Sequence, residues 1–140
     1  NGVGGVVEQQ VPARNREGMG RVTRQSTGPM AADESLVDPS DVPAVAGIAD
    51  SANVKLMKCG AIRPAIETLH AARAHGLETM LGCMIESNAA IAAGVQLSPL
   101  LDYADLDGSL LLAEGADPFA GPPVPSLDPT GVVGTGARRN

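Results

Sequence analysis

Short apolar runs alternate with longer segments of helical periodicity along most of the chain. The runs are VGGVVE from Val3, PMAAD from Pro29, NVKLM from Asn53, ETMLGC from Glu78 and DYADLD from Asp102. They recur about every 25 residues, and each is bounded by polar or turn-forming positions. This pattern predicts five short β-strands separated by helices.

The segments between these runs carry apolar residues at helical spacing and suitable end signals. They cover residues 14–26, 38–47, 62–75 and 87–97. Asp38 precedes Pro39 as an N-cap, and Gly76 is a typical helix stop. A repeated strand and helix unit predicts an α/β fold with a parallel sheet, either an open doubly wound sheet or a barrel. A complete (β/α) barrel needs about 250 residues, so a barrel of 140 residues would be partial.

Composition narrows the class of protein. Hydrophobic residues make up 44% of the chain, enough for one core, which must be aliphatic because aromatic residues make up only 1%. A net charge of −6 argues against a nucleic-acid partner, and no apolar run is long enough to cross a membrane. Cys59 and Cys83 do not form a CxxC pair, so we expect free thiols in a reduced, cytoplasmic protein.

We expect a partial barrel domain over residues 1–121 and a Pro/Gly-rich tail over residues 122–140. The tail lacks periodicity, which predicts extended and loosely packed structure. The first residue is Asn1 rather than methionine, and we therefore expect the segment to begin inside a longer protein.

Polar side chains occur at or just after the carboxyl end of every predicted strand. They are Glu8, Asp33 and Glu34, Lys55 and Lys58, Cys83 and Glu86, and Asp105 and Asp107. In α/β barrels the active site lies on the face that these ends form. The pattern therefore predicts a polar site on one face of the sheet.

The residue types suggest roles. Glu8 and Asp33 can supply oxygen ligands to Mg²⁺, although each could equally be a solvated carboxylate. Strand alternation turns Lys55 into the cavity, where a bound metal ion would lower its pKa and suit it to act as a base. The same alternation turns Lys58 to the other side, as a supporting or surface charge. Asp105 and Asp107, two apart on a strand, could hold an ammonium group or cap the turn before Gly108.

Several of these stretches together resemble the dipeptide epimerases of the enolase superfamily, in the muconate-lactonising subgroup. They are VVEQQVPA, AADESL, NVKLMKCGAI, LGCMIES and YADLDGSLLL followed by DPFAG, and they span residues 6–121. Gln10 replaces the usual proline of the family, and Ala61 replaces a glycine. The resemblance implies strands four to eight of a (β/α)₇β barrel.

The resemblance also implies residue roles. Glu8 and Asp33 match the second and third metal-binding carboxylates, and Lys55 matches the acid/base lysine of the sixth strand. The positions that match the substrate site are Asp105 and Asp107, which hold the α-ammonium group of a dipeptide, and Cys83 and Ile85, whose backbone lines the site.

The activity implied is Mg²⁺-dependent epimerisation of a dipeptide by 1,1-proton transfer through a stabilised enolate. The opposing lysine, the first metal-binding aspartate and the capping domain would precede residue 1, so we expect this segment alone to be inactive. The alternatives are cycloisomerase, o-succinylbenzoate synthase or N-acylamino acid racemase chemistry, or a non-catalytic α/β binding fragment. Among these alternatives, the Asp105 and Asp107 pair favours a dipeptide, whose free ammonium group it could bind. The full-length protein could also form a homo-oligomer.

Overall fold

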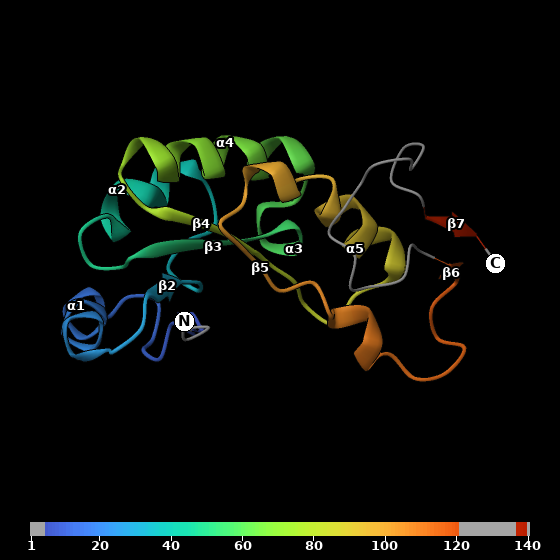
Figure 1. Ribbon diagram of the computed structural model, residues 1–140, viewed down its shortest axis with the longest axis horizontal. Helices are drawn as coiled ribbons and strands as arrows, with labels where there is room; N and C mark the ends of the chain where they lie inside the picture. The colour runs from blue at the N-terminus through green and yellow to red at the C-terminus, as the bar shows by residue number, and fades with distance from the viewer. Residues whose placement is uncertain (1–4, 121–136, 140) are drawn as a thin grey trace.

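Five parallel strands form one sheet in the order in which they occur in the chain (Figure 1). The computed structural model describes residues 5–120 and 137–139. The strands are β1 (Val7–Glu8), β2 (Met30–Ala32), β3 (Ser51–Lys55), β4 (Glu78–Gly82) and β5 (Tyr103–Ala104). Sequential order of parallel strands is the winding of a (β/α) barrel, whereas a doubly wound sheet reverses its order. The predicted fold class is therefore confirmed, with five strands of such a barrel present.

Helices occupy the predicted connections, with shifted ends. They are α1 (Arg16–Gln25), η1 (Pro39–Asp41), α2 (Val42–Val45), α3 (Leu56–Cys59), α4 (Ile62–Ala74), α5 (Asn88–Val95), η2 (Ser98–Leu100) and η3 (Gly108–Leu111). Asp38 is the N-cap of η1, as predicted, and forms a capping box with Asp41. The single helix expected over residues 38–47 is instead divided between η1 and the single turn α2. Helix α3 was not predicted. No helix in residues 5–120 or 137–139 is long and apolar enough to span a membrane.

The core lies between one face of the sheet and the helices that cover it. Met30, Ala32, Val54 and Leu81 project from β2, β3 and β4 into this layer and are almost fully buried. Helix α4 packs against β3 and β4, where it contributes the buried Leu69 (Figure 1). Burial of each of the larger side chains, methionine, valine or leucine, stabilises the fold by about 1.5–3 kcal/mol. Strand alternation therefore leaves the opposite face of the sheet for other side chains.

A short antiparallel pair follows the barrel segment. It joins β6 (Phe119–Ala120) to β7 (Arg138–Arg139). Residues 122–136 and 140, which are most of the predicted tail, lie outside the described residues, as does position 121 at the end of the predicted barrel domain. The boundary at residue 121 and the loose packing of the tail stay predictions.

The start of η3 packs so closely against the loop after β4 that position 108 has no room for a side chain. A β-carbon on Gly108 would lie 1.9 Å from the carbonyl oxygen of Met84. Gly108→Ala should therefore lower the free energy of unfolding by about 1–3 kcal/mol, because the backbone must move. Denaturant unfolding of the variant measures this loss.

Gly5→Ala is the matched control for that substitution, because no atom lies within 4 Å of a β-carbon at position 5. If Gly108→Ala and Gly5→Ala change the free energy of unfolding equally, η3 does not pack on this loop.

Candidate functional site

The carboxyl ends of the first three strands bring Glu8, Asp33 and Lys55 together on the face away from the helices. Glu8 ends β1 beside Ala31 of β2, Asp33 directly follows β2, and Lys55 ends β3. Asp33 and Lys55 are 5% and 8% exposed, respectively. The predicted meeting of the two carboxylates with the lysine thus occurs in the structure.

Asp33 is the centre of an ion-pair cluster. Lys55 Nζ donates to Asp33 Oδ2 at 2.7 Å. Lys58 Nζ donates to the backbone oxygen of Asp33 at 2.8 Å and to its Oδ1 atom. Both oxygens of one buried carboxylate therefore hold ammonium groups.

The predicted orientation of Lys58 is wrong. Alternation assumed that the strand continues through position 58, but β3 ends at Lys55 and α3 begins at Leu56. One helical turn carries the Lys58 side chain back over the strand end, where it is 15% exposed. Lys58 therefore belongs to the site and not to the surface.

The cluster sets the charge state of Asp33 and Lys55. Burial alone would raise the pKa of Asp33, but hydrogen bonds and charge from Lys55 and Lys58 bring that pKa below its ordinary value. Burial alone would lower the pKa of Lys55, but its hydrogen bond to Asp33 and the charges of Asp33, Glu8 and Glu34 raise that pKa. The lowered pKa expected for Lys55 applies to a cavity that holds a metal ion, so it stays a prediction; in the metal-free chain the partner carboxylate outweighs desolvation.

The stability of the metal-free protein should depend on pH through this cluster. Asp33 has a depressed pKa, so its contribution is present above its unfolded pKa of 3.8 and is lost as the pH falls through the lower folded value. Lys55 has a raised pKa, so its contribution is complete below 10.5 and is lost as the pH rises through the higher folded value. Urea unfolding across both ranges measures these losses.

The Asp33→Asn variant provides the control for the acid limb. Its free energy of unfolding should depend less on pH between about 5 and 2, because the carboxyl group with the depressed pKa is gone. An acid limb of unchanged slope would contradict the assignment of Asp33 as its source.

Two amide side chains support the carboxylates. Asn53 Nδ2 donates to Glu8 Oε1 at 2.6 Å across the intervening strand β2. Gln9 Oε1 accepts from the backbone nitrogens of Asp33 and Ser35 at 3.1 and 3.2 Å. Sequence reasoning gave neither amide a role, although Asn53 shares the inward face of β3 with Lys55 and could have been found by that spacing.

Asp105 and Asp107 lie next to one another, but not on a strand as predicted. Strand β5 ends at Ala104, so Asp105 is in the following loop and Asp107 precedes η3. Partial burial raises the pKa of Asp105, and so do the charge of Asp107 and its hydrogen bond to Asp105. The positive charge of Lys55 acts in the opposite direction and lowers that pKa. Asp107 makes no side-chain cap on η3. Two mutually repelling carboxylates suit the binding of a cation better than turn capping.

A hollow of about 550 Å³ lies between the two edge strands of the sheet. Glu8 and Asp105 both line it, although they belong to opposite edges of the sheet, β1 and β5. The remaining lining residues are Gly5, Val6, Met80, Asp102, Tyr103 and Ala104. One predicted metal-binding carboxylate, Glu8, and one predicted ammonium-binding carboxylate, Asp105, therefore share this cavity.

Cys83 and Ile85 follow β4 at the same end of the sheet. Cys83 Sγ accepts a hydrogen bond from the nitrogen of Gly108 at 3.2 Å, and burial is the main cause that raises the thiol pKa. The Ile85 side chain is 63% exposed. The predicted role of the Cys83 and Ile85 backbone in lining a substrate site stays a prediction.

The residues of the cluster fit a divalent cation. Glu8 and Asp33 offer hard oxygen atoms, and Asp33 already attracts two ammonium groups. Within residues 5–120 and 137–139, no three His, Cys, Asp or Glu side chains are arranged to hold a metal ion by themselves. The role of Glu8 and Asp33 as Mg²⁺ ligands therefore stays a prediction.

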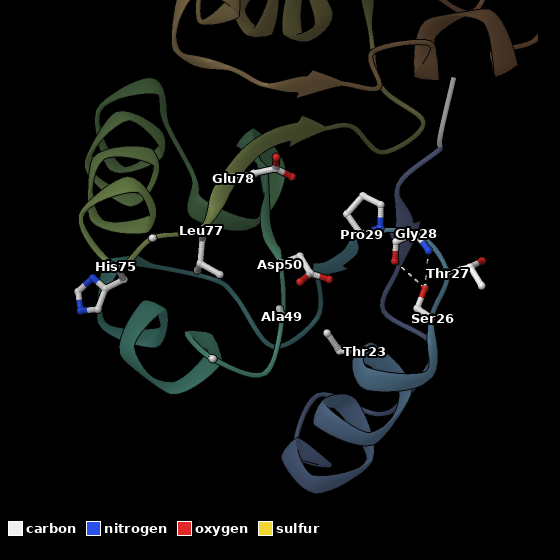
Figure 2. A pocket seen from close by; sticks show the side chains of 12 residues that line it. Thr23, Ser26, Thr27, Gly28, Pro29, Ala49, Asp50, His75, Leu77 and Glu78 are labelled. Atoms are coloured by element: carbon white, nitrogen blue, oxygen red, sulfur yellow. Dashed lines mark hydrogen bonds between the residues drawn. The ribbon is translucent and has the colours of Figure 1, made fainter. Parts of the chain in front are cut away.

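A second hollow lies at the opposite ends of the strands and is not assigned to the site. It has a volume of about 730 Å³ and precedes β2, β3 and β4 (Figure 2). Its lining residues make local hydrogen bonds, such as Ser26 Oγ to the oxygen of Gly28 at 2.6 Å, and bonds between elements, such as the nitrogen of Met30 to Asp50 Oδ2 at 2.8 Å. Active sites of α/β barrels form at the carboxyl ends of the strands, so this hollow is on the wrong face.

Comparison with known families gives one clear match. The sequence model of the Enolase C-terminal domain-like family matches residues 5–126. The match includes all the polar residues at the strand ends.

Known proteins similar to this chain include epimerases. An L-Ala-D/L-Glu epimerase of Bacteroides thetaiotaomicron is 43% identical over 116 residues, covering 83% of this chain and 30% of the relative. A dipeptide epimerase of Enterococcus faecalis, solved with Mg and the dipeptide L-Leu-L-Tyr, superposes with a TM-score of 0.75 and 36% identity, covering 83% of this chain and 34% of that one. A structure described as a putative mandelate racemase/muconate lactonizing enzyme of Sorangium cellulosum superposes with a TM-score of 0.84 at 38% identity. The superposition covers 96% of this chain and 39% of that chain. The chain thus spans about 30% of the first curated relative's length.

Proposed function

Because this chain belongs to the Enolase C-terminal domain-like family, we propose that it supplies half of the active site of a dipeptide epimerase. Its curated relatives are named as L-Ala-D/L-Glu and L-Ala-D/L-amino acid epimerases at 43% and 44% identity. The observation that carries the proposal is the contact of Lys55 with Asp33 at 2.7 Å, in a cavity face that also holds Glu8. In this proposal Lys55 is the proton-transfer group and Asp33 the cation-binding carboxylate, and their contact supports a joint role. We call the chain that spans the length of the curated relatives the full-length protein.

Glu8 and Asp33 would hold Mg²⁺ in this proposal. When bound, the ion would stabilise negative charge on the carboxylate of the substrate as its α-proton leaves. In the metal-free chain Lys55 is held as an ammonium group by Asp33. Lys55 must release a proton before it can accept one from the substrate, and its ion pair with Asp33 opposes that release. Occupation of Asp33 by a cation and activation of Lys55 would therefore be coupled.

Lys55 moves the proton on one face of the substrate. An epimerisation needs a second acid/base group on the other face, which we assign to the part of the full-length protein outside this chain. We therefore infer that residues 1–140 alone do not epimerise.

Asp105 and Asp107 would bind the free ammonium group of the dipeptide. Their proximity to one another and the position of Asp105 in the cavity with Glu8 support this role. Cys83 and Ile85 would line the substrate site with their backbone. We also assign the protein to the cytoplasm, which agrees with the two free thiols Cys59 and Cys83.

The test is a Mg²⁺ titration combined with an assay of dipeptide α-proton exchange in the full-length protein. Wild-type protein should bind Mg²⁺ and exchange the α-proton next to the carboxylate, whereas Glu8→Gln should bind Mg²⁺ more weakly and lose turnover. The control is Glu17→Gln, an exposed carboxylate on α1 that should behave like wild type. Glu8→Gln with wild-type Mg²⁺ affinity would remove Glu8 from the metal site, and wild-type protein without exchange on any dipeptide would overturn the function.

A further inference from the structure

Asn53 is a fully buried polar residue inside the site, between Glu8 and Lys55. Its side chain is 0% exposed. The amide nitrogen donates to Glu8 Oε1 at 2.6 Å, but the amide oxygen is buried and has no hydrogen-bond partner. An unpaired buried acceptor is costly and rare, and it calls for an explanation.

Gly82 provides the space in which this amide lies. A β-carbon at position 82 would be 2.6 Å from Asn53 Oδ1 and 3.0 Å from Lys55 Cε. Gly82 is also the register partner of Lys55 on the neighbouring strand. The unpaired oxygen and the end of the Lys55 side chain therefore lie over the same α-carbon.

We propose that Asn53 is a positioning residue that connects Glu8 to Lys55. Its amide nitrogen fixes one oxygen of Glu8 and leaves the other for a cation. Its amide oxygen receives the Lys55 Nζ atom when that atom leaves Asp33. This inference rests on the proposed function, since it assigns Lys55 as the group that moves the proton.

The arrangement explains how Lys55 can lose its partner without becoming disordered. In the metal-free chain the Lys55 Nζ atom is bound to Asp33 Oδ2. A cation at Asp33 would compete for that oxygen, and the Asn53 oxygen is an unoccupied acceptor over the same α-carbon as the end of Lys55. A neutral acceptor holds an amine in place without the electrostatic stabilisation that a carboxylate gives to its protonated form.

The test compares Asn53→Ala with Ser51→Ala in the full-length protein. Ser51 is the matched control, because it lies on the same face of β3, is fully buried and also has an unpartnered side-chain oxygen. Asn53→Ala should weaken Mg²⁺ binding, titrated without substrate, by roughly 10- to 100-fold, which is typical for loss of a group that orients a metal ligand. Ser51→Ala should keep the wild-type affinity.

A second measurement separates positioning from general loss of structure. α-Proton exchange is followed by NMR for each epimer of one dipeptide. Asn53→Ala should slow the exchange of the epimer served by Lys55 more than that of the other epimer. Gly82→Ala should produce the same asymmetry, because the new methyl group displaces both side chains without removing either.

Three outcomes decide the inference. Weakened Mg²⁺ binding with one-sided loss of exchange supports it. Unchanged Mg²⁺ affinity in Asn53→Ala, or equal slowing of both epimers, overturns it. If wild-type protein binds Mg²⁺ but exchanges no dipeptide, the proposed function fails, and the role of Asn53 toward Lys55 fails with it. In that case the Mg²⁺ affinity of Asn53→Ala still decides whether Asn53 positions Glu8.

Discussion

Lys55→Ala should abolish epimerisation in the full-length protein while leaving one half of the proton exchange intact. Lys55 is the amine that meets the Asp33 carboxylate, at 2.7 Å, from the inward face of β3. Loss of a positioned acid/base group lowers the rate by about 10²- to 10⁴-fold for the face that it serves. The group on the other face should still exchange the α-proton of the opposite epimer with deuterium from solvent. NMR of each epimer in deuterated buffer measures the two rates separately.

Lys58→Ala provides the comparison for this prediction. Lys58 holds Asp33 through both its backbone oxygen and its carboxylate, so its loss should disturb the carboxylate and slow both epimers by similar factors. One-sided loss in Lys58→Ala, or epimerisation by Lys55→Ala near the wild-type rate, would show that the acid/base assignment is wrong.

Asp33→Asn should destabilise the metal-free full-length protein by about 3–5 kcal/mol, because it leaves two buried ammonium groups without a counter-charge. The Asp33 side chain is 7% exposed, and those of Lys55 and Lys58 are 10% and 15% exposed. The substitution preserves the shape of the side chain, so the loss is electrostatic. Denaturant unfolding measures it, and a Mg²⁺ titration of the folded variant should show lost binding.

Two further variants control this result. Glu17→Gln breaks the exposed ion pair with Arg21 and should cost only about 0.3–0.5 kcal/mol. The double variant Asp33→Asn/Lys58→Met should be more stable than Asp33→Asn, since it removes one of the unpaired charges. Asp33→Asn as stable as Glu17→Gln would contradict the buried cluster.

Much of the fold could be predicted because its signals are local. The strand and helix pattern gave the helix over 62–75, observed as Ile62–Ala74, and the stop at Gly76, whose φ is +78°. The ends of strands were less well predicted. Strand β3 starts at Ser51 and stops at Lys55, and β5 covers only Tyr103–Ala104. Strand ends depend on pairing with neighbouring strands, which a single segment does not contain.

The sequence by itself determined that Glu8, Asp33 and Lys55 occur at the ends of parallel strands, because hydrophobic periodicity and residue type are properties of the chain. Parallel strands carry their carboxyl ends to one edge of the sheet, so the meeting of these groups follows from that pattern.

Only the tertiary structure decided the charge and partners of these groups. The single turn α3 brings Lys58 onto Asp33, and the absence of a side chain at Gly82 leaves room for Asn53 to reach Glu8. In the metal-free chain the pKa of Lys55 is raised, although burial alone would lower it, because its neighbours in space are carboxylates. Electrostatic interactions and close packing act between residues far apart in the chain, and their distances are fixed only when the sheet is assembled.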